Sequence, residues 1–263
     1  MVSGFRLAAL ALLLAACSTS SPGGGGTATP KPEATFAFDL GTPEELIASS
    51  QLVSFRASDG VRLEGRLFGE GDVAVVLAHM GGQDDDQSQW FETAGLLADQ
   101  GYQVLTYNRR GVCPGGDQGC SEDRDDADGW RDLVGAVDFL RQGAGSVVIG
   151  GASLGAMEAM YVAGRGEAEI DGLIWVAGAQ GYGKADLLEL APRVSEPKLY
   201  LAGEFDQELG DLAQELHAAS REPKELVLLD TGEHGTDIPV FDDPPIADGF
   251  RQAILDFLDG HFA

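Results

Sequence analysis

Basic residues are scarce in this sequence. Its 263 residues contain 17 Lys and Arg against 43 Asp and Glu, which gives a formal net charge of −26. Because no basic patch forms easily on so acidic a chain, duplex nucleic acid is excluded as a partner. Anionic membrane surfaces repel the protein for the same reason.

Cysteine is also scarce, and the sequence contains no cluster of other metal-ligating residues. The chain has 3 cysteines and 4 histidines, and the two neighbouring cysteines, Cys113 and Cys120, have no histidine close to them. A structural zinc site takes four such ligands. The sequence therefore predicts no metal site and no cofactor.

Apolar residues, in contrast, are plentiful enough for a packed core. They make up 44% of the chain, and charged residues make up 23%. This composition excludes general disorder, a collagen helix and a coiled coil. The length suits one large domain.

The first 32 residues have the composition of an export segment followed by a tether. Arg6 precedes an apolar run over residues 7–16, which has the length of a signal-peptide core and is too short to span a bilayer. The run ends in Leu-Ala-Ala-Cys at residues 14–17, which resembles the bacterial lipobox, whose cysteine receives a lipid such as palmitate and becomes the N-terminus. A cleaved secretion signal with Cys17 unmodified is the alternative.

The sequence thus predicts a signal peptide over 1–16, a flexible tether over 17–32 and a single domain over 33–263. We expect an exported lipoprotein of the bacterial cell envelope, attached to the membrane through lipidated Cys17 only. In that oxidising compartment, a disulfide between Cys113 and Cys120 is expected to close the Gly-rich loop that contains them.

Beyond the tether, strand and helix patterns alternate. Two runs with alternating apolar and polar residues flank Ser58-Asp59-Gly60 and predict a β-hairpin. The continuous apolar run Val73–Ala78 is typical of a strand that is buried on both faces. Strands that alternate with helices indicate an α/β fold, with a mainly parallel sheet, an N-terminal antiparallel hairpin and helices on both faces. Strands are expected near 52–57, 61–68, 73–78, 102–107, 147–151, 173–176, 198–202 and 226–229, and helices near 90–99, 126–141, 154–163, 209–219 and 248–258.

A Gly-x-Ser-x-Gly motif lies where one predicted strand meets the following helix. Its residues are Gly151, Ser153 and Gly155. In a nucleophile elbow, the glycines allow the tight turn that presents the serine in a strained backbone conformation. The pattern arises by chance in Gly-rich chains, so its position between a buried strand and a helix is what makes Ser153 a candidate nucleophile.

An activated serine needs a base, and the base needs an acid to orient it. His234 follows the predicted strand that ends at Leu229, and Asp206 follows the strand near 198–202. Both thus lie at carboxyl ends of parallel strands, where open α/β sheets build their sites. Glu204 is the alternative acid, and Asp230 and Asp237 are less favoured because they crowd the histidine loop.

The other three histidines have structural interpretations. His79 lies in a turn, where a hydrogen bond that holds the loop is the expected role. His217 falls within a predicted helix, and His261 is two residues from the C-terminus. His234 is therefore the candidate base.

Taken together, these residues resemble the α/β-hydrolase superfamily, and within it the dienelactone-hydrolase-like and simple esterase members. The resemblance covers about residues 52–262. Further matches are VVLAHMGG at 75–82 to the oxyanion loop, YNRRG at 107–111 to the D-x-R-G turn, and DLVGAVDFL at 132–140 to the helix before the elbow. Met80 and Asn108 depart from the usual Gly and Asp. The 14 residues from Gly178 to Ala191 leave no room for a large cap domain.

The resemblance implies acyl transfer through a Ser153–Asp206–His234 triad. The oxyanion would be bound by the backbone N–H of Leu154 and by one N–H of the Met80–Gly81 turn, with Gly81 favoured because it lies two residues after His79. We expect a monomeric carboxylesterase that acts on small-molecule esters. The alternatives are a thioesterase, lactonase, peptidase or perhydrolase with the same triad, and a non-catalytic envelope protein that binds ligands on a hydrolase scaffold.

Overall fold

The computed structural model describes residues 38, 40–82, 84–112 and 127–263, all of which belong to one unit spanning Thr35–Ala263. None of the helices in these ranges is long and apolar enough to cross a membrane. The helices are α1 (Pro43–Ser49), α2 (Phe91–Asp99), α3 (Gly129–Leu140), α4 (Leu154–Arg165), α5 (Leu187–Leu190), α6 (Leu209–Ala219), α7 (Ile238–Phe241) and α8 (Pro244–Phe262), with 3₁₀ turns η1 (Gln87–Trp90), η2 (Ala191–Arg193) and η3 (Gly235–Asp237).

Eight strands of the described residues form one mixed sheet in the order β1-β2-β4-β3-β5-β6-β9-β10. The pairs β1–β2 and β2–β4 are antiparallel, and the strands from β4 to β10 run parallel. The strands are β1 (Gln51–Arg56), β2 (Arg62–Phe68), β3 (Val73–Ala78), β4 (Gln103–Tyr107), β5 (Ser146–Ala152), β6 (Gly172–Val176), β9 (Lys198–Gly203) and β10 (Lys224–Leu229). A separate two-stranded hairpin is formed by β7 (Gly181–Tyr182) and β8 (Ala185–Asp186).

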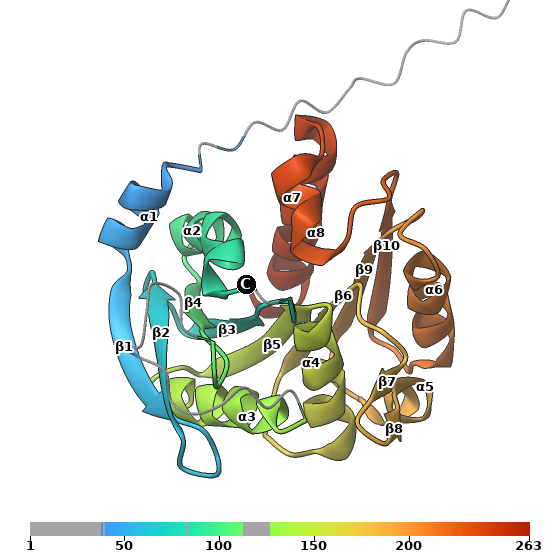
Figure 1. Ribbon diagram of the computed structural model, residues 1–263, viewed down its shortest axis with the longest axis horizontal. Coiled ribbons are helices and arrows are strands. Elements are labelled where there is room, and N and C mark those ends of the chain that lie inside the picture. The colour runs from blue at the N-terminus through green and yellow to red at the C-terminus, as the bar shows by residue number, and fades with distance from the viewer. Residues whose placement is uncertain (1–37, 39, 83, 113–126) are drawn as a thin grey trace, which may run out of the picture. The chain divides into compact units, whose positions relative to one another are not determined.

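Helices cover both faces of the sheet, as Figure 1 shows. On one face, α3 packs against β1 and β3, α4 against β5 and β6, and α6 against β9 and β10. On the other face lie α2, which contacts β4, and α8, which contacts β9 and β10. An ion pair between Arg251 of α8 and Glu92 of α2 joins the two helices on this second face.

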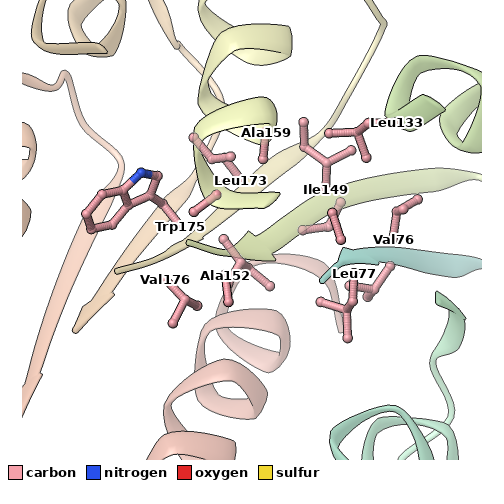
Figure 2. Close-up of a cluster of buried hydrophobic side chains, with 14 of the residues drawn as sticks. Val76, Leu77, Leu133, Ile149, Ala152, Ala159, Leu173, Trp175 and Val176 are labelled. Carbon is pink, nitrogen blue, oxygen red and sulfur yellow. The ribbon is translucent and has the colours of Figure 1, made fainter. Parts of the chain in front are cut away.

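The core follows from strands that are apolar on both sides. Successive residues of a strand point to opposite faces, so a strand sandwiched between two helical layers must be apolar throughout. The residues of β3 from Ala74 to Ala78 are completely buried. Figure 2 shows the two layers: Ile149, Leu173 and Ala159 lie on the α4 side of the sheet, and Leu77, Ala152 and Val176 lie on the opposite side.

The predicted fold is confirmed, with small shifts at some boundaries. The hairpin and every predicted strand are present, and α6 has the predicted bounds. Helix α3 begins at Gly129 rather than near Asp126, and α8 begins at Pro244 rather than Asp248, because prolines occupy its first turn and start the helix early. The sequence reading missed α1, which a capping box at Thr42 begins. Lipid attachment at Cys17 and the disulfide Cys113–Cys120 concern residues outside the described ranges, so both stay predictions.

No large cap follows β6. All residues from 177 to 197 are described, and they hold the β7–β8 hairpin, the single turn α5 and the 3₁₀ turn η2. Trp175 of β6 and Tyr182 of β7 are buried in the core. The Tyr182 hydroxyl accepts a hydrogen bond from the Trp130 N–H at 3.2 Å, so this side chain anchors the hairpin to α3.

Candidate active site

Ser153 occupies the turn between β5 and α4 in a strained conformation. Its backbone angles are φ 52° and ψ −115°, a region that residues with a Cβ rarely adopt. The turn is held by the Ser153 N–H, which donates to the carbonyl of Val176 at 2.9 Å, and by the Met157 N–H, which donates to the carbonyl of Ser153 at 3.1 Å. Such strain persists only where the surroundings enforce it, and here β6 and α4 do so.

Close backbone approach explains the two glycines of the motif. A Cβ built on Gly155 would lie 2.4 Å from the carbonyl oxygen of Ala78 at the end of β3. A Cβ on Gly151 would lie 2.5 Å from the carbonyl carbon of Gly155. Both contacts are with backbone atoms, which cannot rotate away. The first turn of α4 therefore sits directly on the end of β3, and Ser153 is presented at the carboxyl edge of the sheet.

His234 and Asp206 are hydrogen-bonded to each other. The distance between His234 Nδ1 and Asp206 Oδ2 is 2.7 Å. The Asp206 side chain is 3% exposed, whereas that of His234 is 35% exposed. A carboxylate can only accept, so Nδ1 carries a proton, and in the neutral form of the ring the lone pair then lies on Nε2. This is the tautomer that a general base at Nε2 requires.

The loops that carry these residues interlock at the strand ends. The Phe205 N–H donates to the carbonyl of Thr231 at 2.9 Å, and the Glu204 N–H donates to the carbonyl of Leu229 at 2.7 Å. The first of these bonds joins the acid loop to the histidine loop, which places Asp206 under the imidazole. Glu204, the alternative acid, is exposed, and Asp206 is the residue in contact with His234.

The histidine loop also reaches the elbow. A Cβ built on Gly235 would lie 3.3 Å from the Cβ of Ala152 and 2.6 Å from the sulfur of Met80. Gly235 adjoins His234 in the chain, and Ala152 adjoins Ser153. The structure thus brings together the three loops that carry Ser153, His234 and Met80.

The oxyanion turn that the sequence predicts lies against the first residue of α4. A Cβ built on Gly81 would lie 2.9 Å from the Cβ of Leu154. The Met80 N–H donates to the side-chain oxygen Oε1 of Gln89 at 3.2 Å, which leaves it engaged elsewhere. The choice between the Met80 and Gly81 N–H groups as oxyanion donor stays a prediction.

His79 has the structural role expected of it. The side chain is buried, its Nδ1 lies 2.6 Å from the carbonyl oxygen of Met80, and its Nε2 accepts the Arg109 N–H at 3.2 Å. Because Nε2 accepts, Nδ1 is the protonated nitrogen and the ring is neutral. His217 lies in the last turn of α6, and His261 contacts Glu225 at 2.8 Å.

Two features near the site were missed by sequence reasoning. Arg109 and Glu158 form an ion pair at 3.1 Å, and their side chains are 1% and 0% exposed. The sequence signal for this ion pair was Glu158, a charged residue among the apolar residues of α4. Gln89 was missed as well, because the nine positions that separate it from Met80 follow no helix or strand period.

Asp237 lies close enough to His234 for the two to interact electrostatically, and Asp85 in turn lies close to Asp237. Burial and the nearby Asp85 raise the pKa of Asp237, and His234 partly opposes this shift. Asp85 accepts hydrogen bonds from the Gly82 N–H and from Gln89, the latter at 2.7 Å. Asp85 therefore supports the turn as well as adding negative charge beside it.

Among the residues that the structure describes, no group of three or more His, Cys, Asp or Glu could hold a metal ion. The chemistry available at this edge of the sheet is that of a strained serine, a histidine oriented by a buried carboxylate, and backbone N–H groups.

Solved structures with the same fold include several hydrolases. An esterase of Pyrococcus furiosus, Pf2001, is 17% identical, with a TM-score of 0.67 over 88% of this chain and 99% of that chain. An esterase domain of a Rhodothermus marinus protein is 19% identical, with a TM-score of 0.62 over 81% of this chain and 100% of that chain. A dienelactone hydrolase of Anabaena variabilis is 18% identical, with a TM-score of 0.64 over 82% and 100%. At these identities the similarity concerns the fold.

The comparison with curated proteins gives no match. The family model described as "Alpha/beta hydrolase family" matches residues 75–258, from β3 to α8. The matched segment covers more than half of the chain and contains the strand ends that carry Ser153, Asp206 and His234. The chain belongs to the alpha/beta hydrolase family.

Proposed function

We propose that the protein is a serine hydrolase that cleaves carboxylic esters through an acyl-enzyme. The observation that carries this proposal is the 2.7 Å hydrogen bond between His234 Nδ1 and the buried Asp206 carboxylate, in a loop that touches the elbow of Ser153. A non-catalytic scaffold would need neither the strained serine nor this oriented imidazole. The similar folds of two esterases and a dienelactone hydrolase agree with the proposal.

In the proposed reaction, Ser153 Oγ attacks the ester carbonyl carbon while His234 Nε2 takes the hydroxyl proton. The proton then passes to the leaving alcohol as the acyl-enzyme forms, and water repeats the sequence to release the acid. Asp206 holds the tautomer and stabilises the imidazolium. The backbone N–H groups of Leu154 and Gly81 bind the oxyanion, and the loss of one such donor typically costs about 2.7–4 kcal/mol of transition-state stabilisation.

The substrate proposal follows from the short segment after β6. Since residues 177–197 hold a small hairpin and short helical turns, no large lid covers the strand ends from this segment. We therefore infer that small or accessible esters are the substrates. Thioesters, lactones and peptides would use the same residues, and a panel with matched acyl groups separates these leaving groups.

The placement of the enzyme in the cell is a further part of the proposal. We propose that residues 1–16 direct export and that a lipid on Cys17 attaches the enzyme to the envelope membrane by the tether that ends at residue 32. The acidic catalytic domain then works near the membrane as a monomer, and the lipid is its membrane contact.

The decisive experiment is labelling of the full-length protein in detergent with a fluorophosphonate, with the adduct mapped by mass spectrometry. The proposal predicts an adduct on Ser153 that is lost in His234→Ala. The control is Ser54 of β1, which is separated from β5 by β2, β4 and β3 in the sheet and stays unlabelled. A folded sample without an adduct on Ser153 would favour the non-catalytic scaffold instead.

A further inference from the structure

The buried Arg109 guanidinium has contacts that stability alone does not explain. Its side chain is 1% exposed and lies two residues after the end of β4. Arg109 Nη2 donates to the carbonyl of His79 at 2.6 Å, and Nη1 donates to the carbonyl of Met80 at 3.1 Å. Its Nε donates to Glu158 Oε2 at 3.2 Å. We name these three contacts the Arg109 clamp.

The clamp fixes the direction of two successive peptide groups. These peptide bonds are trans and planar, so each carbonyl points opposite to the N–H of the following residue. The Met80 carbonyl accepts from Arg109 Nη1 and from His79 Nδ1, so the Gly81 N–H is directed away from both donors. The preceding peptide is held at both ends, because the His79 carbonyl contacts Arg109 and the Met80 N–H contacts Gln89.

The other end of the clamp lies on the helix that begins at the elbow. Glu158 belongs to α4, four residues after Leu154, and residues so spaced lie on the same side of a helix. A Cβ built on Gly81 would contact Leu154 at 2.9 Å. Arg109 therefore connects the turn that carries the Gly81 N–H to the helix that carries the Leu154 N–H.

A buried ion pair is a weak source of net stability, because the loss of hydration of both charges offsets their attraction. An apolar pair of similar volume would fill the same space. What an apolar pair would lose is the set of directed N–H donors that hold the two carbonyls, since guanidinium donors have a fixed planar geometry. The geometry of these contacts thus favours a role in orientation.

We propose that Arg109, anchored by Glu158, is a positioning residue that sets the separation and direction of the two oxyanion-binding N–H groups. It acts through the backbone of residues 79–81 and does not touch the substrate. This inference rests on the proposed esterase function for its catalytic consequence, whereas the positioning of the turn is measurable without activity.

The test is the double variant Arg109→Met/Glu158→Leu, which removes both charges and leaves neither buried alone. A matched control is Arg110→Met/Asp132→Leu. That pair is also buried, with Arg110 Nη2 and Asp132 Oδ1 at 2.7 Å, but it joins the segment after β4 to α3. Any general effect of losing a buried ion pair appears in both double variants.

Three quantities are measured with the full-length protein in detergent. For p-nitrophenyl butyrate, kcat is expected to fall by about 100-fold in the Arg109 pair variant, the size expected for a misplacement of about 1 Å, with KM unchanged. The affinity for a butyl trifluoromethyl ketone falls by the same factor. Ser153 Oγ adds to the carbonyl carbon of this inhibitor while His234 takes the hydroxyl proton. The ketone oxygen becomes an oxyanion that is bound by the two N–H groups.

The third quantity is hydrogen exchange of the peptides that cover residues 79–82. Faster exchange there in the Arg109 pair variant than in the control supports the proposal. Exchange equal to that of the control, or a kcat no lower than that of the control, overturns it. If the double variant does not fold, Arg109→Lys serves instead, because one ammonium group cannot reproduce the planar contacts to both carbonyls and Glu158.

The outcomes separate the two proposals. A wild-type protein without a Ser153 adduct would end the esterase proposal, and the exchange of residues 79–82 would still decide whether Arg109 positions the turn. A labelled wild-type protein whose Arg109 pair variant behaves like the control would keep the esterase proposal and remove the positioning role.

Discussion

Replacement of Asp206 by Asn tests whether the contact between this residue and His234 orients the proposed catalytic base. Asp206 Oδ2 lies 2.7 Å from His234 Nδ1, and the Asp206 side chain is 3% exposed. Asn has nearly the same shape, so the loop between β9 and α6 keeps its packing. The amide, however, can present an N–H to Nδ1, which moves the imidazole proton to Nε2 and removes the base.

The expected effect is large because the wrong tautomer disables proton transfer and the imidazolium loses its carboxylate. A loss of about 10⁴-fold in kcat is typical of this change in serine hydrolases, which corresponds to about 5 kcal/mol of transition-state stabilisation. The assay is the initial rate of p-nitrophenyl butyrate hydrolysis at saturating substrate, together with the melting temperature. KM is expected to change little, since the ground-state ester does not contact Asp206.

The matched control is Glu204→Gln, two residues away in the same loop. Glu204 is exposed, and its hydrogen bond to the carbonyl of Leu229 is made by its backbone N–H, which the substitution leaves in place. Its kcat is therefore expected to equal that of the wild type. If Glu204→Gln were the damaging change and Asp206→Asn kept full activity, the assignment of the acid and the reasoning from the hydrogen bond would be refuted.

Three further predictions concern the elbow, acid stability and the membrane anchor. Gly155→Ala places a Cβ 2.4 Å from the Ala78 carbonyl, so it is expected to lower stability by about 1–3 kcal/mol, measured as a lower melting temperature; an unchanged value would contradict the close packing. Hydrogen bonds from Arg110 hold the pKa of Asp59 below its ordinary 3.8, so this contribution to stability is present above pH 3.8 and is lost as pH falls through the folded-state pKa. Asp59→Asn should therefore lower the melting temperature at pH 7 and make less difference in acid, and a pH-independent difference would argue against the ion pair. Cys17→Ser should move the protein from the membrane fraction to the soluble fraction, and unchanged fractionation would reject lipidation at this residue.

Much of the fold could be predicted from local sequence patterns, because each pattern indicates the burial or the backbone geometry of its own segment. The continuous apolar run of β3 needs burial on both faces, and the spacing of Gly151, Ser153 and Gly155 needs only a strand, a tight turn and a helix in succession. Asp206 and His234 were predicted by their positions after strands, because parallel strands align their carboxyl ends at one edge of the sheet.

Other parts of the site depend on contacts between segments that are distant in the chain, which no local period encodes. Two acids, Glu204 and Asp206, follow the same strand, and the bond from the Phe205 N–H to the histidine loop determines which one lies under the imidazole. The bond between Arg109 and Glu158 spans 49 positions.

The sequence by itself therefore determined the order of strands and helices, the elbow and the set of candidate residues, because these follow from side-chain periodicity and the steric demands of glycine. The tertiary structure alone decided which acid meets His234, that the Met80 N–H is taken by Gln89, and that the buried Arg109 holds the carbonyl of Met80. The physical reason is that a hydrogen bond depends on distance and direction to within a few tenths of an ångström. Only the packed chain sets those values.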